Sequence, residues 1–175
     1  IGGVHKFAEK TFDISADLQE LAKTGISVVC SGPKAILDIP KTLEFLETLG
    51  VPVITFGQTY LPAFWSSDSP FISPLSLNDP CLIAKSHEIR KELGLSGGQL
   101  IANPISKKDQ IPFEKMEPII MDAVKSANEQ NIITKELTPF VLSRINELTK
   151  GKSLLANIAL IKNNAKLASQ IALCF

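Results

Sequence analysis

The stretch ISVVCSGPK, residues 26–34, decides the fold that the sequence predicts. It begins with apolar and β-branched residues, the pattern of a strand that is buried on both faces. A second such stretch, VPVITF at residues 51–56, follows a predicted helix that has Pro40 in its first turn and ends at Gly50. Strand, helix and strand at this spacing predict a βαβ unit, a parallel pair of strands with a right-handed crossover.

The remaining chain continues this alternation and favours one α/β domain. Asp79 and Pro80 have the pattern of an N-cap and a first helical residue, opening a helix that ends near Leu93. Residues 99–103 predict a third strand. Hydrophobic spacing and helix-start signals predict three more helices, at residues 112–127, 138–149 and 154–173.

Residues 57–78 predict a long irregular loop. They contain three prolines and four aromatic residues, so we expect an ordered loop whose aromatic side chains pack on something. A functional loop and a contact between subunits both explain this composition.

The last predicted helix, residues 154–173, is nearly apolar on all sides. Such a helix is normally buried by other elements, and too few remain in this chain to cover it. The chain also begins at Ile1 and lacks an initiating methionine. We therefore expect it to be part of a longer protein.

Composition and charge argue against several classes of protein. Eighteen basic residues balance eighteen acidic ones, with no basic run that would bind nucleic acid. No apolar stretch reaches the roughly 18 residues of a membrane span, and no signal peptide is visible. We expect a soluble, cytoplasmic protein, although a missing start could hide an organellar targeting segment.

Three cysteines, Cys30, Cys81 and Cys174, are odd in number and widely spaced. This spacing fits neither a disulfide framework nor a zinc site with paired ligands, and it indicates a reducing compartment. Because Cys30 lies in an apolar strand, we expect it to be a packed thiol.

Lys34 is a candidate nucleophile. It follows a predicted strand and precedes a helix, so it should lie at the carboxyl edge of the sheet, where α/β proteins bind ligands. The helix macrodipole and an apolar setting would lower the pKa of its amine and favour Schiff-base formation. A solvated lysine on a turn is the alternative.

Residues 13–17 place the carboxylates of Asp13 and Asp17 close to the hydroxyl of Ser15. Oxygen donors of this kind suit magnesium or manganese. Asp17 and Glu20 also have the pattern of a helix capping box, and one residue can serve both purposes.

Three other polar residues have two interpretations each. His5 follows Gly2 and Gly3, whose backbone amides could face an anion, but a lone histidine of this kind is more often a hydrogen-bonded structural residue. Asn157 and Asn164 lie on the apolar last helix and must meet a backbone group, water or ligand if they are buried. Their amides could bind a pyrimidine edge or cap a neighbouring loop.

Taken together, these residues resemble the pseudouridine-5'-phosphate glycosidase family, also called the IndA-like family. The matching segments run through the whole chain: GGVH at 2–5, TFDISADL at 11–18, VVCSGPKAILD at 28–38, LEFLET at 43–48, ANPI at 102–105, TPF at 138–140, NI at 157–158 and NNA at 163–165. Residues 1–175 would then be the C-terminal part of one glycosidase domain whose N-terminal part is absent.

The resemblance implies a three-layer α/β/α sandwich with a mixed, largely parallel sheet, incomplete here, in a protein that is commonly a homotrimer. It implies reversible cleavage of the C–C glycosidic bond of pseudouridine 5'-phosphate to uracil and ribose 5-phosphate. A divalent metal, typically Mn²⁺, is expected as the cofactor. Nucleic acids and membranes are not expected partners.

By matching position, Lys34 is the nucleophile that holds ring-opened ribose 5-phosphate as an imine-type intermediate. Asp13 matches the metal position, with Asp17 as a second candidate. His5 matches a sugar-phosphate contact and Asn157 a base contact. The substrate-contact segment corresponds to Ser15, Ala16 and Asp17.

Two departures from the family pattern bear on activity. Pro33 stands where the family more often has alanine before the lysine. The catalytic glutamate and the phosphate-binding lysine of the family precede the segment that begins this chain, so we expect residues 1–175 alone to be inactive. The alternatives are another Schiff-base lyase that also uses Lys34, and a non-catalytic or truncated relative.

Overall fold

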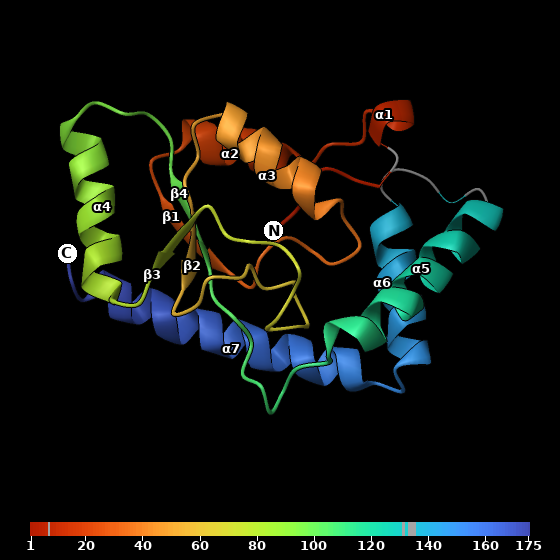
Figure 1. Ribbon diagram of the computed structural model, residues 1–175. Coiled ribbons are helices and arrows are strands. Elements are labelled where there is room, and N and C mark those ends of the chain that lie inside the picture. Colours follow the sequence, from red (N-terminus) through yellow and green to blue (C-terminus); the bar gives the residue numbers. More distant parts are fainter. Residues whose placement is uncertain (7, 131, 133–135) are drawn as a thin grey trace.

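The computed structural model describes residues 1–6, 8–130, 132 and 136–175 and forms a layered α/β structure (Figure 1). The strands are β1 (Ser27–Cys30), β2 (Val53–Phe56), β3 (Leu75–Leu77) and β4 (Gln99–Ala102). The helices are α1 (Ala8–Thr11), α2 (Ala16–Lys23), α3 (Ile39–Thr48), α4 (Pro80–Glu92), α5 (Phe113–Glu129), α6 (Leu137–Leu148) and α7 (Lys152–Ala172).

The four strands form one sheet in the order β1-β4-β2-β3. Each pairing between the described strands is parallel, so the expected mixed character is not found among them. β1 and β2 run parallel, but β4 lies between them. The prediction that β1 and β2 are paired neighbours was therefore wrong, because a local βαβ pattern cannot show that a later strand will insert.

Helices cover both faces of this sheet, which confirms the three-layer α/β/α architecture. Leu100 and Ala102 of β4 pack with α2 and α3, whereas Ile101 between them packs with α4 and α7. Successive strand residues point to opposite faces, so the apolar run of β4 serves both layers. A further cluster joins α5, α6 and the first half of α7.

The predicted helices form close to their expected limits. Asp79 caps α4 by accepting the backbone N–H of Cys81, with Pro80 as the first helical residue. Asp38 caps α3 in the same manner through the N–H of Lys41. Such caps satisfy backbone donors that have no partner inside the helix, so the sequence signal reflects a real local energy.

The segment between β2 and α4 is mostly irregular, as expected, but it ends in the short edge strand β3. Its aromatic residues pack inside the chain. Trp65 is buried and donates from Nε1 to the carbonyl oxygen of Ser153 at 3.1 Å. Phe64 meets Trp65, and Phe71 meets Phe113, in edge-to-face contacts. Internal packing therefore accounts for three of the four aromatic side chains.

The cysteines differ from expectation. Cys81 at the start of α4 and Cys174 after α7 form a disulfide across a sequence separation of 93 residues. The prediction of no disulfide was wrong, because these two helix ends are distant in sequence and come together only in the folded chain. The cysteine spacing therefore no longer supports a reducing compartment. Cys30 is a free, buried thiol, as expected, and burial raises its pKa.

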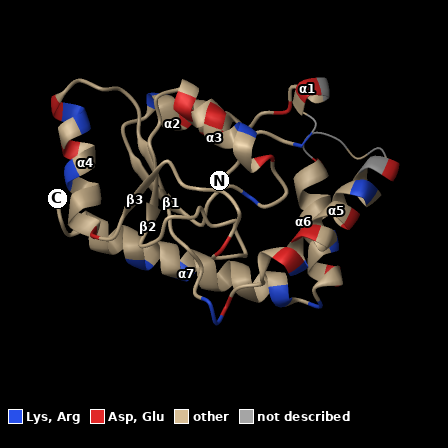
Figure 2. Ribbon diagram, in the orientation of Figure 1, with Lys and Arg blue, Asp and Glu red and all other residues tan. Residues whose placement is uncertain are grey.

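Charged residues of both signs are interspersed over the outer helices, and α7 carries few of them (Figure 2). In the part of the chain that the structure describes, no helix has both the length and the apolar character needed to cross a membrane.

Candidate functional site

The first residues of the chain form one wall of the candidate site. Val4 pairs with Ile14, and His5 pairs with Leu37, in isolated antiparallel bridges. The backbone N–H of His5 donates to the carbonyl oxygen of Asp13 at 3.0 Å, and that of Ser15 donates to Gly3 at 3.0 Å. These bonds bring Asp13 and Ser15 beside His5.

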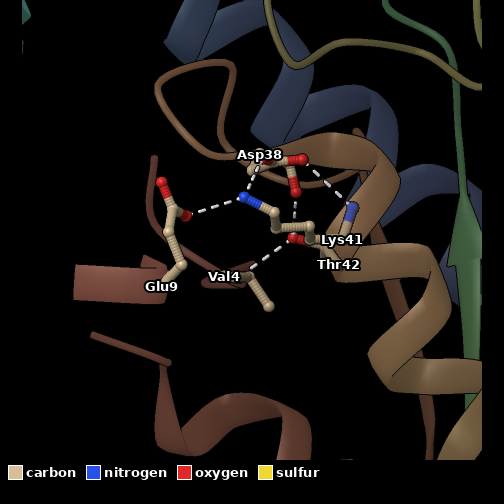
Figure 3. A network of polar contacts seen from close by, with 5 residues as sticks. All are labelled: Val4, Glu9, Asp38, Lys41 and Thr42. Atoms are coloured by element: carbon tan, nitrogen blue, oxygen red, sulfur yellow. Dashed lines mark hydrogen bonds and ion pairs between the residues drawn. The ribbon is translucent and has the colours of Figure 1, made fainter. Parts of the chain in front are cut away.

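A polar network fastens this segment to the start of α3 (Figure 3). Thr42 Oγ1 accepts the N–H of Val4 at 3.0 Å and donates to the carbonyl oxygen of Asp38 at 2.7 Å. The amine of Lys41 lies 2.9 Å from Glu9 Oε2 and 3.1 Å from Asp38 Oδ2. Glu9, and then Asp38, raise the pKa of Lys41. The network joins α1, α3 and the first segment of the chain at Val4, next to His5.

The turn after β1 presents Lys34. Gly32 has a φ of +82°, and a Cβ placed on it would lie 2.2 Å from the carbonyl oxygen of Pro62, so glycine is required there. The carbonyl oxygen of Ser31 accepts the N–H of Phe64 at 2.9 Å, and the N–H of Lys34 donates to Ile1 at 3.1 Å. The backbone on both sides of Pro33 is thus held by other segments.

Lys34 itself is half-buried and lines a cavity of about 270 Å³. The residues around this cavity come from four separate stretches of sequence: Gly2, His5, Asp13, Ser15, Lys34, Leu37 and Thr138. The ring Nδ1 of His5 lies 3.6 Å from Asp13 Oδ2. The structure therefore brings together the amine, imidazole, carboxylate and hydroxyl that the sequence singled out.

Lys34 precedes α3, as expected, but Asp38 caps that helix and its carboxylate lies at the helix N-terminus. The expected influence of the helix N-terminus on the Lys34 amine stays a prediction.

Asp17 and Ala16 lie beside the cavity lining rather than in it. Both are exposed residues in the first turn of α2. The cap of α2 is Ser15, whose hydroxyl accepts the N–H of Asp17, so the predicted capping role of Asp17 was wrong. The carboxylate of Asp17 instead accepts the N–H of Gly2 at 2.7 Å.

Gly2 is required by close packing. A Cβ on Gly2 would lie 2.1 Å from Ser15 Oγ and 3.0 Å from Asp17 Oδ2. Its N–H donates to Asp17, so the interpretation in which the Gly2 amide faces an anion is not supported.

Asn157 does not line this cavity as the described residues define it. Its side-chain Oδ1 is buried and has no hydrogen-bond partner among the described residues. A buried carbonyl oxygen lowers the stability of the protein unless a donor forms a hydrogen bond with it, and a bound base could supply that donor. The contact between Asn157 and the base stays a prediction.

A divalent cation would find two donors at this cavity, the Asp13 carboxylate and the His5 ring. Within the described residues, no group of three or more His, Cys, Asp or Glu side chains could hold a metal. Cations such as Mg²⁺ commonly use one or two carboxylates together with water and substrate oxygens, and Asp13 fits that mode. Asp17 fits it less well because its carboxylate already accepts the N–H of Gly2.

Thr138 was missed as a site residue. It lies in the first turn of α6 and reaches the cavity from the far end of the sequence. The helix-start pattern of Thr138 and Pro139 explained this residue without a role at the site, although TPF at 138–140 is one of the segments that match the family.

Comparison with known proteins identifies the family of the chain. The family model for Indigoidine synthase A like protein matches residues 1–174. The chain is 60% identical over 172 residues to a pseudouridine-5'-phosphate glycosidase of Paracoccus denitrificans and 58% identical to that of Roseobacter denitrificans. Each match covers 98% of this chain, but only 57% and 56% of those relatives. The chain thus spans little more than half the length of these curated relatives.

Two solved structures share the fold. The prealnumycin C-glycosynthase AlnA, in complex with ribulose 5-phosphate, superposes with a TM-score of 0.92 at 29% identity, covering 99% of this chain and 57% of AlnA. An indigoidine synthase A-like protein from Thermotoga maritima superposes with a TM-score of 0.86 at 34% identity, covering 98% of this chain and 56% of the other. On this evidence, the chain belongs to the Indigoidine synthase A like protein family.

Proposed function

We propose that the protein carrying this chain cleaves the C–C glycosidic bond of pseudouridine 5'-phosphate to give uracil and ribose 5-phosphate, with Lys34 as the nucleophile. The observation that carries this proposal is the cavity in which Lys34, His5, Asp13 and Ser15 converge. The names of the relatives at 58–60% identity supply the substrate.

The chemistry suits an amine. The base of a C-glycoside departs as a carbon leaving group, which is poor, and a lysine can hold the ring-opened sugar as an imine-type adduct during that departure. His5, beside Asp13, would contact the sugar phosphate, and Ser15 to Asp17 would contact the substrate. The neighbour AlnA, crystallised with a five-carbon sugar phosphate, supports a ligand of that class here.

A divalent metal, Mn²⁺ by family resemblance, would be held through Asp13 and would supply charge neutralisation for substrate oxygens. We propose Asn157 as the base contact, since its buried Oδ1 has no partner among the described residues. The family resemblance also implies a homotrimer and the assignment of residues 1–175 to the C-terminal part of one domain. Both stay predictions.

A second candidate is the formation of a C-glycoside, which the name of the C-glycosynthase neighbour favours. The same lysine could serve either direction. The identity of 29% to that neighbour, against 60% to a glycosidase, ranks cleavage first.

The test uses the complete protein that carries this chain, incubated with ribose 5-phosphate and Mn²⁺, reduced with borohydride and digested for mass spectrometry. We expect a sugar adduct on Lys34, and release of uracil from pseudouridine 5'-phosphate by the unreduced enzyme. Lys34→Arg, which keeps the charge and removes the primary amine, should lower uracil release at least about a thousandfold.

Lys6→Arg is the matched control, because Lys6 lines a neighbouring cavity that also includes Leu37. It should keep both activity and the adduct on Lys34. Uracil release without any adduct would remove the covalent role of Lys34, and the absence of both would overturn the assignment.

A further inference from the structure

A buried polar network lies where β1 and β4 end. The register pairs Cys30 with Ala102, the last residue of each strand, so Ser31 and Asn103 follow side by side. Ser31 is 2% exposed and Asn103 5% exposed. Two buried polar side chains at this position need partners, because an unpaired buried donor or acceptor costs stability.

Asn164 of α7 supplies those partners. Its Oδ1 accepts from Asn103 Nδ2 at 3.1 Å. The hydroxyl of Ser31 lies 3.3 Å from Asn164 Oδ1 and 3.2 Å from Asn164 Nδ2, so it can donate to the first or accept from the second. One amide therefore joins two strand ends to a helix more than a hundred residues away from Ser31 in sequence.

Ser31 is also the first residue of the turn that presents Lys34. Backbone contacts also hold that turn: the N–H of Phe64 donates to the carbonyl oxygen of Ser31, the N–H of Lys34 donates to that of Ile1, and the nitrogen of Ile1 donates to that of Gly32. Asn164 adds a contact with the side chain of Ser31, and it does not itself line the cavity.

We propose that Asn164 is a positioning residue for Lys34, acting through Ser31. The inference rests on the proposed role of Lys34 as the nucleophile. Asn164 would hold the turn after β1 so that Lys34 stays in a reactive geometry. Such support matters because reaction rates fall steeply when a nucleophile is displaced.

The adjacent Asn163 provides a matched control. It is the same residue type on the same helix, is also half-buried, and donates from Nδ2 to the carbonyl oxygen of Pro104 at 3.0 Å. That bond supports the segment after β4 and does not involve Ser31.

The experiment compares Asn164→Ala, Asn164→Asp and Asn163→Ala in the complete protein, by steady-state release of uracil from pseudouridine 5'-phosphate. We expect Asn164→Ala to lower kcat about 10- to 100-fold with KM changed less than about threefold. Asn164→Asp keeps the shape and an acceptor for Ser31 and Asn103, so it should recover part of the loss. Asn163→Ala should stay within about twofold of the parent.

The route through Ser31 is tested by a double-mutant cycle. If Asn164 acts through Ser31, the variant carrying both Ser31→Ala and Asn164→Ala should lose no more activity than Asn164→Ala alone. Equal losses in Asn163→Ala and Asn164→Ala, or losses that match the fraction of unfolded protein in each sample, would overturn the proposal in favour of a purely structural role.

Failure of the proposed function would be visible first in the parent protein, as absence of uracil release. In that case the rate at which an amine-reactive ester acylates Lys34 replaces kcat as the measure. Asn164→Ala should then change that rate at least about threefold, with Lys6 unaffected, because a freed turn alters the exposure of the amine. An unchanged acylation rate would overturn the positioning role by itself.

Discussion

The two halves of α7 share one helical pattern but have different surroundings. In the second half, Leu167 and Ile171 are buried against α4 and the sheet, and Asn164 is fully engaged in the network with Ser31. The first half buries Ala156 and Leu160 against α5 and α6, but it leaves Leu155 and Ile161 68% and 64% exposed.

The two asparagines repeat this contrast. Asn157 lies seven residues before Asn164, about two helical turns, and so projects in a similar direction. Its buried Oδ1 has no partner among the described residues. The spacing of amides on an apolar helix therefore does not indicate which of its positions other elements will bury.

The largest expected effect tests whether burial differs between the halves. Leu167 is 3% exposed, so Leu167→Ala should lower the free energy of unfolding by about 2–5 kcal/mol through lost contacts and a cavity. Leu155→Ala, the control at an exposed position of the first half, should change it by less than about 0.5 kcal/mol. Urea unfolding followed by circular dichroism measures both. A comparable loss in the control would mean that a second chain covers the first half of α7 in solution.

Removal of the disulfide should weaken the attachment of the second half of α7 to α4, because Cys174 directly follows α7. The bond between Cys81 and Cys174 closes a long loop, with a sequence separation of 93, and Cys174→Ser should lower the free energy of unfolding by about 2–4 kcal/mol. Reduction of the parent protein by dithiothreitol should have the same effect and should add nothing in the Cys174→Ser variant. If dithiothreitol leaves the unfolding curve of the parent unchanged, the two cysteines are not paired in solution.

Substitution of Asn164 and Asn157 tests whether their hydrogen bonding differs. Asn164→Leu leaves buried polar groups on Ser31 and Asn103 without their partner and should destabilise the protein by about 1–3 kcal/mol. Asn157→Leu removes a buried carbonyl that has no partner among the described residues, so it should change the free energy of unfolding by less than about 1 kcal/mol or raise it. Thermal unfolding without ligand measures both, and equal losses would show that Asn157 has a structural partner.

The smallest effect lies outside α7, in the exposed network of Lys41. Glu9, followed by Asp38, raises the pKa of Lys41 above the ordinary value, so its ion pairs stabilise the protein below the pKa of the unfolded chain. That contribution is lost as the pH rises through the higher pKa of the folded state. The melting temperature of Lys41→Met should therefore fall slightly below that of the parent at pH 8 and converge with it once the pH exceeds the raised pKa of the folded state. A difference that persists at high pH would assign the effect to packing of the Lys41 stem.

Much of the local structure could be predicted because its causes are local. Asp79 with Pro80, and Asp38 with Pro40, begin helices through bonds to residues a turn away. The candidate site was also largely visible in the sequence, since His5, Asp13, Ser15 and Lys34 come from segments whose combined pattern resembles one family. Asp17 was assigned the wrong capping role because its actual partner, Gly2, lies on another segment.

The longer helices, the strands β1, β2 and β4, the packed thiol of Cys30 and the candidate site residues could all be predicted from the sequence. Other features became visible only in the folded chain. The strand β4 lies between β1 and β2, and Cys81 pairs with Cys174. Thr138 lines the cavity, and Asn164 contacts Ser31 in the turn before Lys34. These two groups of features differ in the sequence separation of the contacts that cause them. Periodicity and capping depend on neighbours within one or two turns, whereas strand order, disulfide pairing and buried amide networks depend on contacts between segments that approach one another only when the core is formed.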